Sequence, residues 1–297
     1  MSIFNKLVVG TLPILPKSIV AKVAKKYIAG ETLQDAVFTV QQLNSHKAMA
    51  TIDVLGEDIT TREEATVFQK ENLEVLTAIS QSKINSNLSI KLTSLGLKID
   101  KEFCQKNVEE IVALAKHNNN FVRIDMEDHT CTDATLEIYR NVRAKYSNVG
   151  IVIQAYLHRS ENDILQLANE GANVRLCKGI YNEPPTVALK EREKVQQNYL
   201  HLLKILLAKK CYVGIATHDD VLIDGAKRII MEMKLSPQEY EFQMLLGVRT
   251  QRRDELLNEG HRLRIYTPFG KQWYEYSVRR LKENPQIAGY VFKAMFE

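Results

Sequence analysis

Residues 150–177 read GIVIQAYLHRSENDILQLANEGANVRLC, and this stretch decides the fold. It contains two short apolar runs, Gly150–Ala155 and Asn173–Cys177, on either side of an amphipathic segment, Glu161–Asn169. Short apolar runs rich in β-branched residues are typical of buried strands, whereas apolar residues at three- and four-residue spacing are typical of helices. A strand, a helix and a second strand in this order predict two parallel strands joined by a helical crossover.

The same alternation runs from about residue 47 toward the C-terminus. The expected strands are Ala48–Leu55, Leu88–Leu92, Phe121–Met126, Gly150–Ala155, Asn173–Cys177, Tyr212–Ala216, Glu241–Leu245 and Leu263–Tyr266. The expected helices include Thr61–Ser80, Glu102–His117, Asp133–Tyr146, Glu161–Asn169, Thr186–Lys209 and Asp220–Met233. Eight such units, the last ending in a helix around Tyr276, favour a closed barrel over an open sheet. We therefore predict an α/β protein in which residues 47–297 form a (β/α)8 TIM-type barrel and residues 1–46 form an N-terminal helical extension.

Composition and motifs speak against several classes of protein. A chain of 297 residues with 45% hydrophobic and 26% charged residues is ordinary for a globular protein with a substantial core. The net charge of +4 is too small to indicate a nucleic-acid-binding surface. The four cysteines are far apart, no His-Glu-x-x-His pair occurs, and no Gly-x-Gly-x-x-Gly motif occurs, so neither a zinc site nor a Rossmann-type nicotinamide site is expected. We expect no signal peptide and no transmembrane helix, and a cytoplasmic location.

Polar side chains lie at or near the carboxyl ends of seven of the eight expected strands, where barrel enzymes place their chemistry. They are Lys91; Asp125, Glu127 and Asp128; Gln154 and Tyr156; Arg175 and Lys178; Thr217, His218 and Asp219; Gln243; and Tyr266. Ionisable groups at the ends of apolar strands are costly unless they are paired or used. A structural ion pair can explain any one of them, but the same feature in seven units predicts a large polar site of mixed charge.

The last expected helix contains a second polar pattern, Tyr276-Ser277-Val278-Arg279-Arg280-Leu281-Lys282-Glu283. At helical spacing Tyr276, the two arginines and Glu283 project from one broad face. A guanidinium fork suits bidentate capture of a carboxylate, and Glu283 could hold an arginine in place. Taken alone, however, such a pattern is typical of a solvated helix face, because isolated helix ion pairs are weak.

Two other chemistries are open at the strand ends. Lys91 and Lys178 stand where barrel aldolases place a nucleophilic amine, so a Schiff-base lyase is an alternative function. Each lysine could equally be the partner of a strand-end carboxylate such as Asp125. A metal centre at Asp125, Glu127, Asp128 and His129 has little support, because only the first two carboxylates share a face of the strand. We therefore expect no metal.

Seven runs of the sequence resemble those of the proline dehydrogenase family, in the order of the barrel strands. They are Ser89–Gly96, Val122–Asp128, Val174–Tyr181, Ile215–Asp219, Tyr240–Leu245, Arg264–Gly270 and Tyr276–Glu283. The similarity extends from roughly residue 40 to the C-terminus, and several motifs in one order are far more specific than any single motif. No aldehyde dehydrogenase sequence follows in this chain, so the resemblance is to the monofunctional bacterial form.

The resemblance implies an FAD enzyme on a distorted barrel that oxidises L-proline to Δ1-pyrroline-5-carboxylate by hydride transfer to flavin N5. Residues expected to bind the substrate carboxylate are Lys91, Arg279 and Arg280, with Asp125 and Glu283 bracing these cations. Residues expected to enclose the proline ring are Tyr181, Leu245, Tyr266 and Tyr276. Residues expected to line the flavin are Gln154, Arg175 near N5, Cys177, Lys178, Gly179, Thr217, His218 and Gln243.

The resemblance also implies an electron acceptor and an enzyme that uses the product, and it leaves hydroxyproline as an alternative to proline as the substrate. The electron acceptor would be a membrane quinone, and a separate pyrroline-5-carboxylate dehydrogenase would use the product. The basic stretch that ends at Gly30 would allow peripheral contact with the inner membrane. Hydroxyproline oxidation is the rival activity within the family, and Tyr266 is expected to crowd a ring hydroxyl.

The chain departs from the family pattern at two positions. Ile180 stands where alanine is usual, and the larger side chain is expected to narrow the pocket or change the closure of its loop. Cys177 stands where valine is usual, a swap of similar volume that leaves the flavin contact to the backbone.

Overall fold

The computed structural model describes residues 26–56, 59–274 and 277 of the chain. Four of the predicted substrate-site residues, Tyr276, Arg279, Arg280 and Glu283, lie outside this part. The same holds for most of the basic N-terminal stretch that ends at Gly30.

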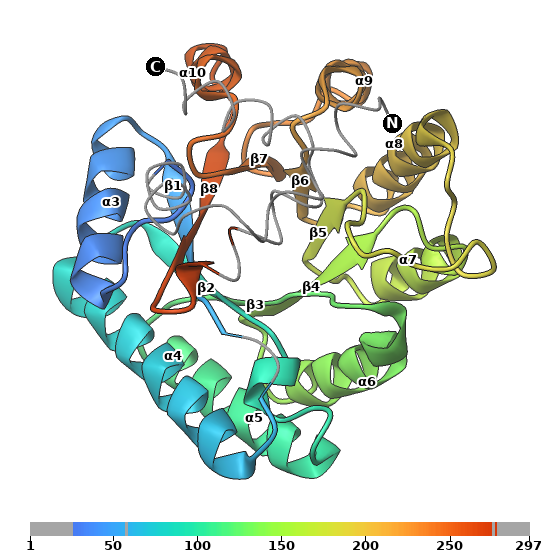
Figure 1. The fold of residues 1–297 in the computed structure, drawn as a ribbon. Coiled ribbons are helices and arrows are strands. Elements are labelled where there is room, and N and C mark those ends of the chain that lie inside the picture. Colours follow the sequence, from blue (N-terminus) through green and yellow to red (C-terminus); the bar gives the residue numbers. More distant parts are fainter. Residues whose placement is uncertain (1–25, 57–58, 275–276, 278–297) are drawn as a thin grey trace, which may run out of the picture.

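Eight parallel strands close into a barrel in sequence order, with β1 paired to both β2 and β8 (Figure 1). The strands are β1 (Met49–Val54), β2 (Ser86–Ile90), β3 (Val122–Ile124), β4 (Val149–Gln154), β5 (Val174–Cys177), β6 (Val213–Ala216), β7 (Tyr240–Leu245) and β8 (Leu263–Phe269). Each overlaps one of the eight strands expected from the sequence, so the predicted (β/α)8 class is confirmed.

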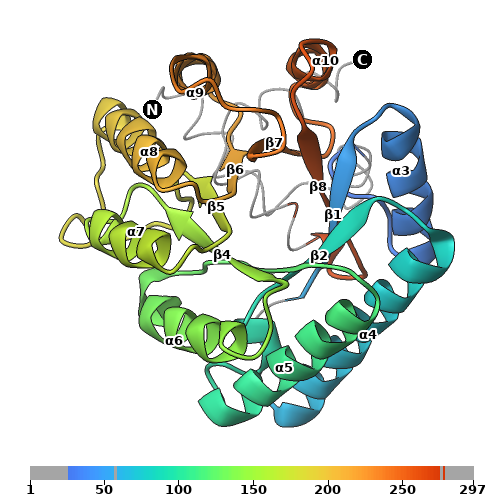
Figure 2. The ribbon, with the colours of Figure 1, turned by 180° about the vertical axis from the view of Figure 1, so that it is seen from behind.

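Helices form a ring outside the barrel, as the views from both ends show (Figures 1 and 2). They are α3 (Leu33–Ser45), α4 (Arg62–Ser82), α5 (Lys101–His117), α6 (Thr132–Arg143), α7 (Ser160–Asn169), α8 (Arg192–Ala208), α9 (Asp220–Glu232) and α10 (Thr250–Asn258), with short 3-10 turns η2 (Thr93–Leu95) and η3 (His129–Cys131). Local sequence sets several of their starts. In α4, for example, Thr61 accepts from the backbone of Glu64 and the Glu64 carboxylate accepts in return, which is a capping box.

The prediction of a helix from Thr186 was wrong at its start, because α8 begins at Arg192. The preceding residues pair with the β4–α7 loop instead. Leu189 donates its backbone N–H to the carbonyl of Tyr156 at 2.7 Å, and Ala188 forms an antiparallel bridge with Leu157. Backbone groups used in this pairing are not available to a helical turn.

Alternate residues of the strands face opposite environments. The side chains that face the helix ring are apolar and buried, for example Ile52, Leu88, Val122 and Phe242. The side chains between them are polar or charged and make contacts across the barrel interior. Tyr266 on β8, for instance, reaches Asp125, which directly follows β3, and β8 is not paired with β3. The barrel is therefore filled by a polar network rather than by the branched apolar layers that are usual in this fold.

Candidate active site

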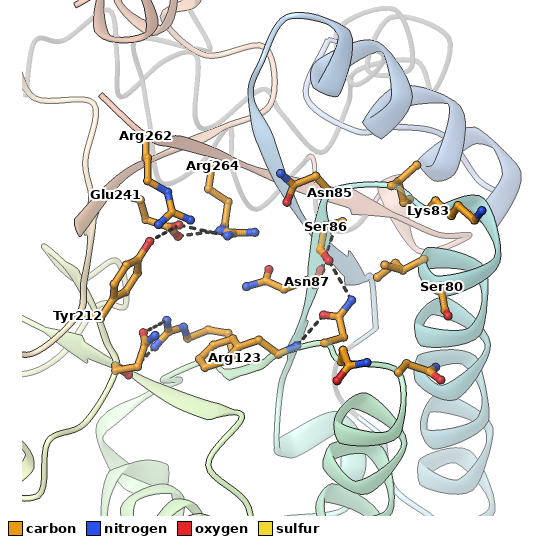
Figure 3. Close-up of a pocket in the computed structure, with 17 residues that line it drawn as sticks. Ser80, Lys83, Asn85, Ser86, Asn87, Arg123, Tyr212, Glu241, Arg262 and Arg264 are labelled. Atoms are coloured by element: carbon orange, nitrogen blue, oxygen red, sulfur yellow. Dashed lines mark hydrogen bonds and ion pairs between the residues drawn. The ribbon is translucent and has the colours of Figure 1, made fainter. Parts of the chain in front are cut away.

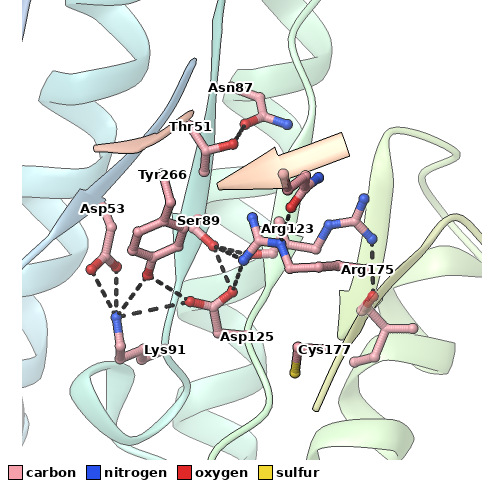
Figure 4. A network of polar contacts seen from close by, with 12 residues as sticks. Thr51, Asp53, Asn87, Ser89, Lys91, Arg123, Asp125, Arg175, Cys177 and Tyr266 are labelled. Atoms are coloured by element: carbon pink, nitrogen blue, oxygen red, sulfur yellow. Dashed lines mark hydrogen bonds and ion pairs between the residues drawn. The ribbon is translucent and has the colours of Figure 1, made fainter. Parts of the chain in front are cut away.

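Asp125 is the hub of the network at the carboxyl ends of the strands (Figure 4). One carboxylate oxygen accepts from Arg175 Nη1 at 2.7 Å and from the Ser89 hydroxyl at 2.7 Å. The other accepts from the Tyr266 hydroxyl at 2.8 Å, and Lys91 Nζ lies 3.9 Å away. Four neighbours from three other strands and one strand-end loop therefore meet at this carboxylate.

Lys91 has a partner that the sequence analysis missed. Its Nζ donates to both carboxylate oxygens of Asp53, at 2.7 and 2.9 Å, and to the Tyr266 hydroxyl at 3.2 Å. Asp53 lies on β1 and is 1% exposed. The nearest partner of the lysine is therefore Asp53, and Asp125 is the more distant one. The signal was present in the sequence, because Thr51 and Asp53 place two polar side chains on one face of an otherwise apolar strand.

The two carboxylates at this site have pKa values shifted in opposite directions. Burial raises the pKa of Asp53 and outweighs the opposing effect of the Lys91 charge, and the nearby Asp125 charge raises this pKa further. Burial also raises the pKa of Asp125, but the charges of Arg175 and Lys91 and the hydrogen bonds from Ser89 and Tyr266 outweigh it, so that the pKa is lowered. Asp125 is therefore the carboxylate whose negative charge the site stabilises most.

Arg175 connects this hub to a second carboxylate deeper in the barrel. Its Nε donates to Gln243 Oε1 at 2.6 Å, and Gln243 Nε2 donates to Glu241 at 2.6 Å. Glu241 in turn pairs with Arg264 at 2.6 Å. Burial raises the pKa of Glu241, but Arg264 and the hydrogen bonds from Arg264, Tyr212 and Gln243 lower it to about 2.

Arg175 also stacks on the ring of Tyr266, and its Nη2 is available to a ligand. The guanidinium lies 5.2 Å from the centre of the Tyr266 ring. Its Nη2 donates to none of the residues that the structure describes, while Nε and Nη1 are both in use. The Arg175 guanidinium is therefore a cation in a fixed position whose Nη2 can donate to an electron-rich ring or to an anionic group.

The structure brings together five of the predicted site residues in one network: Lys91, Asp125, Arg175, Gln243 and Tyr266. Most of the others lie on neighbouring strand ends with contacts of their own. Gln154 is 2% exposed and donates to the carbonyl of Glu127 at 2.8 Å. Lys178 pairs with Asp219 at 3.2 Å.

His218 and Leu245 are joined across two strand ends. The Leu245 backbone N–H donates to His218 Nε2 at 2.8 Å, so Nε2 is the unprotonated nitrogen of the ring. Thr217 accepts from the backbone N–H of Asp219 at 3.1 Å. The Cys177 thiol donates to the carbonyl of Ile153 at 3.6 Å.

The β5–α8 loop carries Gly179, Ile180 and Tyr181 and is tied down by a residue that sequence reasoning missed. Glu183 is 4% exposed, accepts from the His129 backbone N–H at 2.8 Å and contacts the His129 imidazole. Ile180 is 43% exposed, so the side chain that departs from the family pattern lies at the surface of this loop. No local pattern predicts the Glu183–His129 contact, because the two residues are 54 positions apart.

Gly179 cannot be replaced without strain. Its φ of +109° is a conformation that other residues rarely adopt, and a Cβ atom here would lie 2.1 Å from the Tyr156 ring. In the part of the chain that the structure describes, no group of three or more His, Cys, Asp or Glu side chains is arranged to hold a metal ion.

The fold and the strand-end network define a (β/α)8-barrel enzyme whose site presents fixed cations and carboxylates at the carboxyl ends of the strands. Residues 36–292 match the family model described as proline dehydrogenase. The chain belongs to the proline dehydrogenase family.

Two relatives illustrate this similarity over nearly the whole chain. Proline dehydrogenase 1 of Bacillus subtilis (strain 168) is 38% identical over 274 residues, which cover 92% of this chain and 91% of the relative. Proline dehydrogenase of Deinococcus radiodurans is 36% identical over 279 residues, covering 92% and 90%. Both matches cover nine-tenths or more of each of the two chains compared.

A larger protein shares the fold. Proline utilization A (PutA) from Bdellovibrio bacteriovorus superposes with a TM-score of 0.84 at 25% sequence identity, over 89% of this chain. This chain spans about a third of that one, since the match covers 33% of the PutA chain.

Proposed function

We propose that this protein oxidises L-proline to Δ1-pyrroline-5-carboxylate with FAD as its cofactor. The observation that carries the proposal is the strand-end network of Lys91, Asp125, Arg175 and Tyr266 in a member of the proline dehydrogenase family. Proline is a small zwitterion. A site that binds it needs cations that contact its carboxylate and side chains that enclose its ring.

Lys91 is the described residue best suited to hold the substrate carboxylate. Its side chain is 11% exposed, and its ammonium is held by Asp53 and the Tyr266 hydroxyl. Arg279 and Arg280 would add two guanidinium groups, each able to form charge-assisted hydrogen bonds worth roughly 1.5–3 kcal/mol. Tyr266 would stand beside the ring, with its hydroxyl held by Asp125.

The donor groups at the strand ends fit a flavin. When bound, FAD would accept a hydride from the proline carbon next to nitrogen, while the amine proton leaves to solvent. Arg175 has a spare nitrogen and a fixed position, and its charge would favour the anionic reduced ring. Gln154, Cys177, Lys178, Gly179 and Gln243 would line the ring and its substituents, and Thr217 and His218 would lie along the rest of the cofactor.

The spectrum of the purified protein tests this proposal directly. We expect a yellow protein whose flavin absorbance is bleached by L-proline in the absence of oxygen. D-Proline and L-pipecolate at the same concentration serve as controls for an unspecific reductant. A protein that takes up no FAD, or whose bound flavin is not reduced by L-proline, would contradict the proposal.

The carboxylate clamp can be tested apart from flavin binding. Replacing Arg279 or Arg280 by methionine should raise the KM for proline at least tenfold while FAD remains bound, because each variant loses one charged donor. Arg228→Met is the matched control, since Arg228 is an exposed arginine on α9. Unchanged KM values in both clamp variants would show that these arginines lie on a solvated helix face.

The Schiff-base alternative is not favoured by the lysine contacts. Lys91 pairs with Asp53 at 2.7 Å and Lys178 with Asp219 at 3.2 Å. An ion pair stabilises the protonated ammonium, which has no lone pair to attack a carbonyl. Covalent labelling of either lysine by borohydride and a carbonyl substrate would instead establish the lyase.

Proline should be preferred over hydroxyproline. Two contacts fix the Tyr266 hydroxyl, at 2.8 Å to Asp125 and 3.2 Å to Lys91, so the ring has little freedom to move away from an added hydroxyl. The ratio of kcat/KM values for the two substrates measures this preference, and a ratio near one would contradict it.

Electrons would leave the reduced flavin for a quinone, and a separate pyrroline-5-carboxylate dehydrogenase would take the product. Among the described residues, no helix is long and apolar enough to cross a membrane. We propose peripheral membrane contact through the basic N-terminal stretch. Reduction of a soluble quinone analogue on addition of proline tests the acceptor, and co-sedimentation with anionic vesicles tests the membrane contact.

A further inference from the structure

A cavity lies at the amino ends of the strands, at the opposite end of the barrel from the candidate active site (Figure 3). Its volume is about 590 Å³, which is within the range of small-molecule sites. The residues that begin β2, β3, β7 and β8 form its walls, together with the loops that follow α4 and α5. None of the predicted site residues lines it.

The lining of this cavity carries four cations and one carboxylate. The cations are Lys83, Arg123, Arg262 and Arg264, and the carboxylate is Glu241. Glu241 is already committed, because Arg264 pairs with it at 2.6 Å and the Tyr212 hydroxyl donates to it at 2.8 Å. Three of the four cations therefore have no carboxylate partner among the described residues.

Arg123 is the most deeply buried of these cations, at 2% exposure. Its Nη1 donates only to carbonyl oxygens, those of Ile151 at 2.9 Å and Asn173 at 2.7 Å, and its Nε has no partner among the described residues. Burial and then the charge of Arg175 lower its pKa to about 9. A buried charge without a counter-ion is costly, and a bound anion would reduce that cost.

The side-chain amide of Asn87 adds an uncharged hydrogen-bond donor to the cations that line the cavity. Asn87 is 8% exposed, and in Figure 3 its amide extends into the space between Arg264 and Arg123. The amide oxygen accepts from the Thr51 hydroxyl, so that the NH2 group is the part left to bind a ligand. Asn87 is thus a buried side chain with a donor directed into the cavity.

The ends of two helices give the competing explanation for these cations. Helices α4 and α5 end at Ser82 and His117, and their last carbonyls attract positive charge. This accounts for Lys83, which follows α4 directly. It does not account for Arg262 and Arg264, which come from the start of β8 on the opposite wall in Figure 3.

We propose that this cavity binds a small oxyanion, a carboxylate or a phosphate, through Arg262 and the Asn87 amide, with Arg123 as the buried cation beneath it and Lys83 adding positive charge from the facing wall. Guanidinium groups suit both ligands because their parallel N–H donors match two oxygens of one anion. The proposal does not rest on the proposed oxidation, since none of the residues Lys91, Asp125, Arg175 and Tyr266 lines the cavity.

Titration calorimetry of the full chain with inorganic phosphate and, separately, with acetate tests the proposal at constant ionic strength. We expect one saturable site for at least one of the two anions, and the anion that binds identifies the ligand class. In Arg262→Gln the dissociation constant should rise at least tenfold. Lys204→Gln, which removes an exposed lysine from the middle of α8, should leave it unchanged.

Dependence on Arg262 separates this site from the strand-end cations, because an anion bound by those cations would bind equally to both variants. Lys83→Gln is a second variant whose folding is not in question, since Lys83 is exposed at the end of α4, and it should weaken binding in the same direction. Absence of saturable binding for both anions, or equal binding to wild type and both cavity variants, would overturn the proposal.

Discussion

Replacing Asp125 by asparagine removes one negative charge from the hub of the strand-end network and leaves its shape nearly unchanged. The asparagine oxygen could still accept from Arg175, and its NH2 group could donate to the Tyr266 hydroxyl. What the variant loses is the only carboxylate that the structure places against Arg175 among the described residues. Lys91 keeps its pair with Asp53.

The size of the effect follows from burial. The side chains of Arg175 and Asp125 are 8% and 13% exposed, and their nearest atoms are 2.7 Å apart. Removing one partner of a buried ion pair costs about 3–5 kcal/mol, and the retained hydrogen bond offsets part of that loss. We therefore expect Asp125→Asn to lower the free energy of unfolding by about 2–4 kcal/mol, and kcat/KM for proline by roughly ten- to a hundredfold.

Urea denaturation of the FAD-saturated protein measures the stability change, and initial rates measure the activity. Asp128→Asn is the matched control, because this aspartate is three positions away in the same motif but pairs with Lys98 at 3.2 Å near the surface. Asparagine also caps a helical turn about as well as aspartate. We expect the control to change stability by less than about 1 kcal/mol.

The pH dependence gives an independent check. The pKa of Asp125 is lowered from its ordinary value of 3.8, so the charge stabilises the fold above that pH and its contribution is lost as the pH falls below it. The stability difference between wild type and Asp125→Asn should therefore be constant near neutral pH and shrink below about pH 4. Equal stability of Asp125→Asn and Asp128→Asn at pH 7 would refute the buried-hub reasoning.

Three further predictions concern residues at other depths of the barrel. Gly179→Ala should destabilise the protein by about 2 kcal/mol or more, as thermal unfolding would show, whereas Gly260→Ala, with φ +84° and open space around it, should suffer only backbone strain of about 1–2 kcal/mol. Glu241→Gln should lower the free energy of unfolding by about 3 kcal/mol at pH 7, because the pKa of Glu241 falls from 4.5 to about 2 on folding. In urea titrations at several pH values this difference should disappear as the pH drops through that interval, and a difference that does not depend on pH would contradict the prediction. Glu183→Gln should lower kcat/KM for proline about tenfold without loss of FAD, because one charged contact to His129 holds the loop; an effect confined to stability would show that the contact has no role in the site.

Local sequence was enough to place every strand of the barrel. Each strand is a short apolar run bounded by polar or turn residues, and such runs differ clearly from the amphipathic segments between them. The start of α8 was misplaced because its pattern continues backward through Thr186, and only the tertiary pairing of Leu189 with Tyr156 prevents a helix there. Helix ends that depend on distant backbone partners are not encoded in the local pattern.

The residues of the candidate site that could be predicted are those near the carboxyl ends of the expected strands. Lys91 and Asp125 were found because they directly follow β2 and β3, and Arg175 and Tyr266 because each is a polar residue near the carboxyl end of an apolar run. Asp53 was missed, although it lies in a comparable position in β1 and its spacing from Thr51 shows that it faces the barrel interior. The pairing of Glu183 with His129 depends on how two long loops meet, and no spacing in the sequence records it.

The polar interior connects the two ends of the barrel. An unbroken series of hydrogen bonds and ion pairs runs from Arg264 through Glu241, Gln243 and Arg175 to Asp125. The amide of Gln243 fixes the sense of this series, because its NH2 group must donate to Glu241 while its oxygen accepts from Arg175.

An anion in the cavity at the amino ends would compete with Glu241 for Arg264. Any weakening of that pair would free Glu241 to hold Gln243 more strongly and would change the position of the Arg175 guanidinium. Since Arg175 is the cation proposed to face the flavin, the same network that fixes the active site would also report the occupancy of the opposite end. A barrel interior filled with branched apolar side chains would carry no such coupling, because such layers have neither charges nor a defined hydrogen-bond direction.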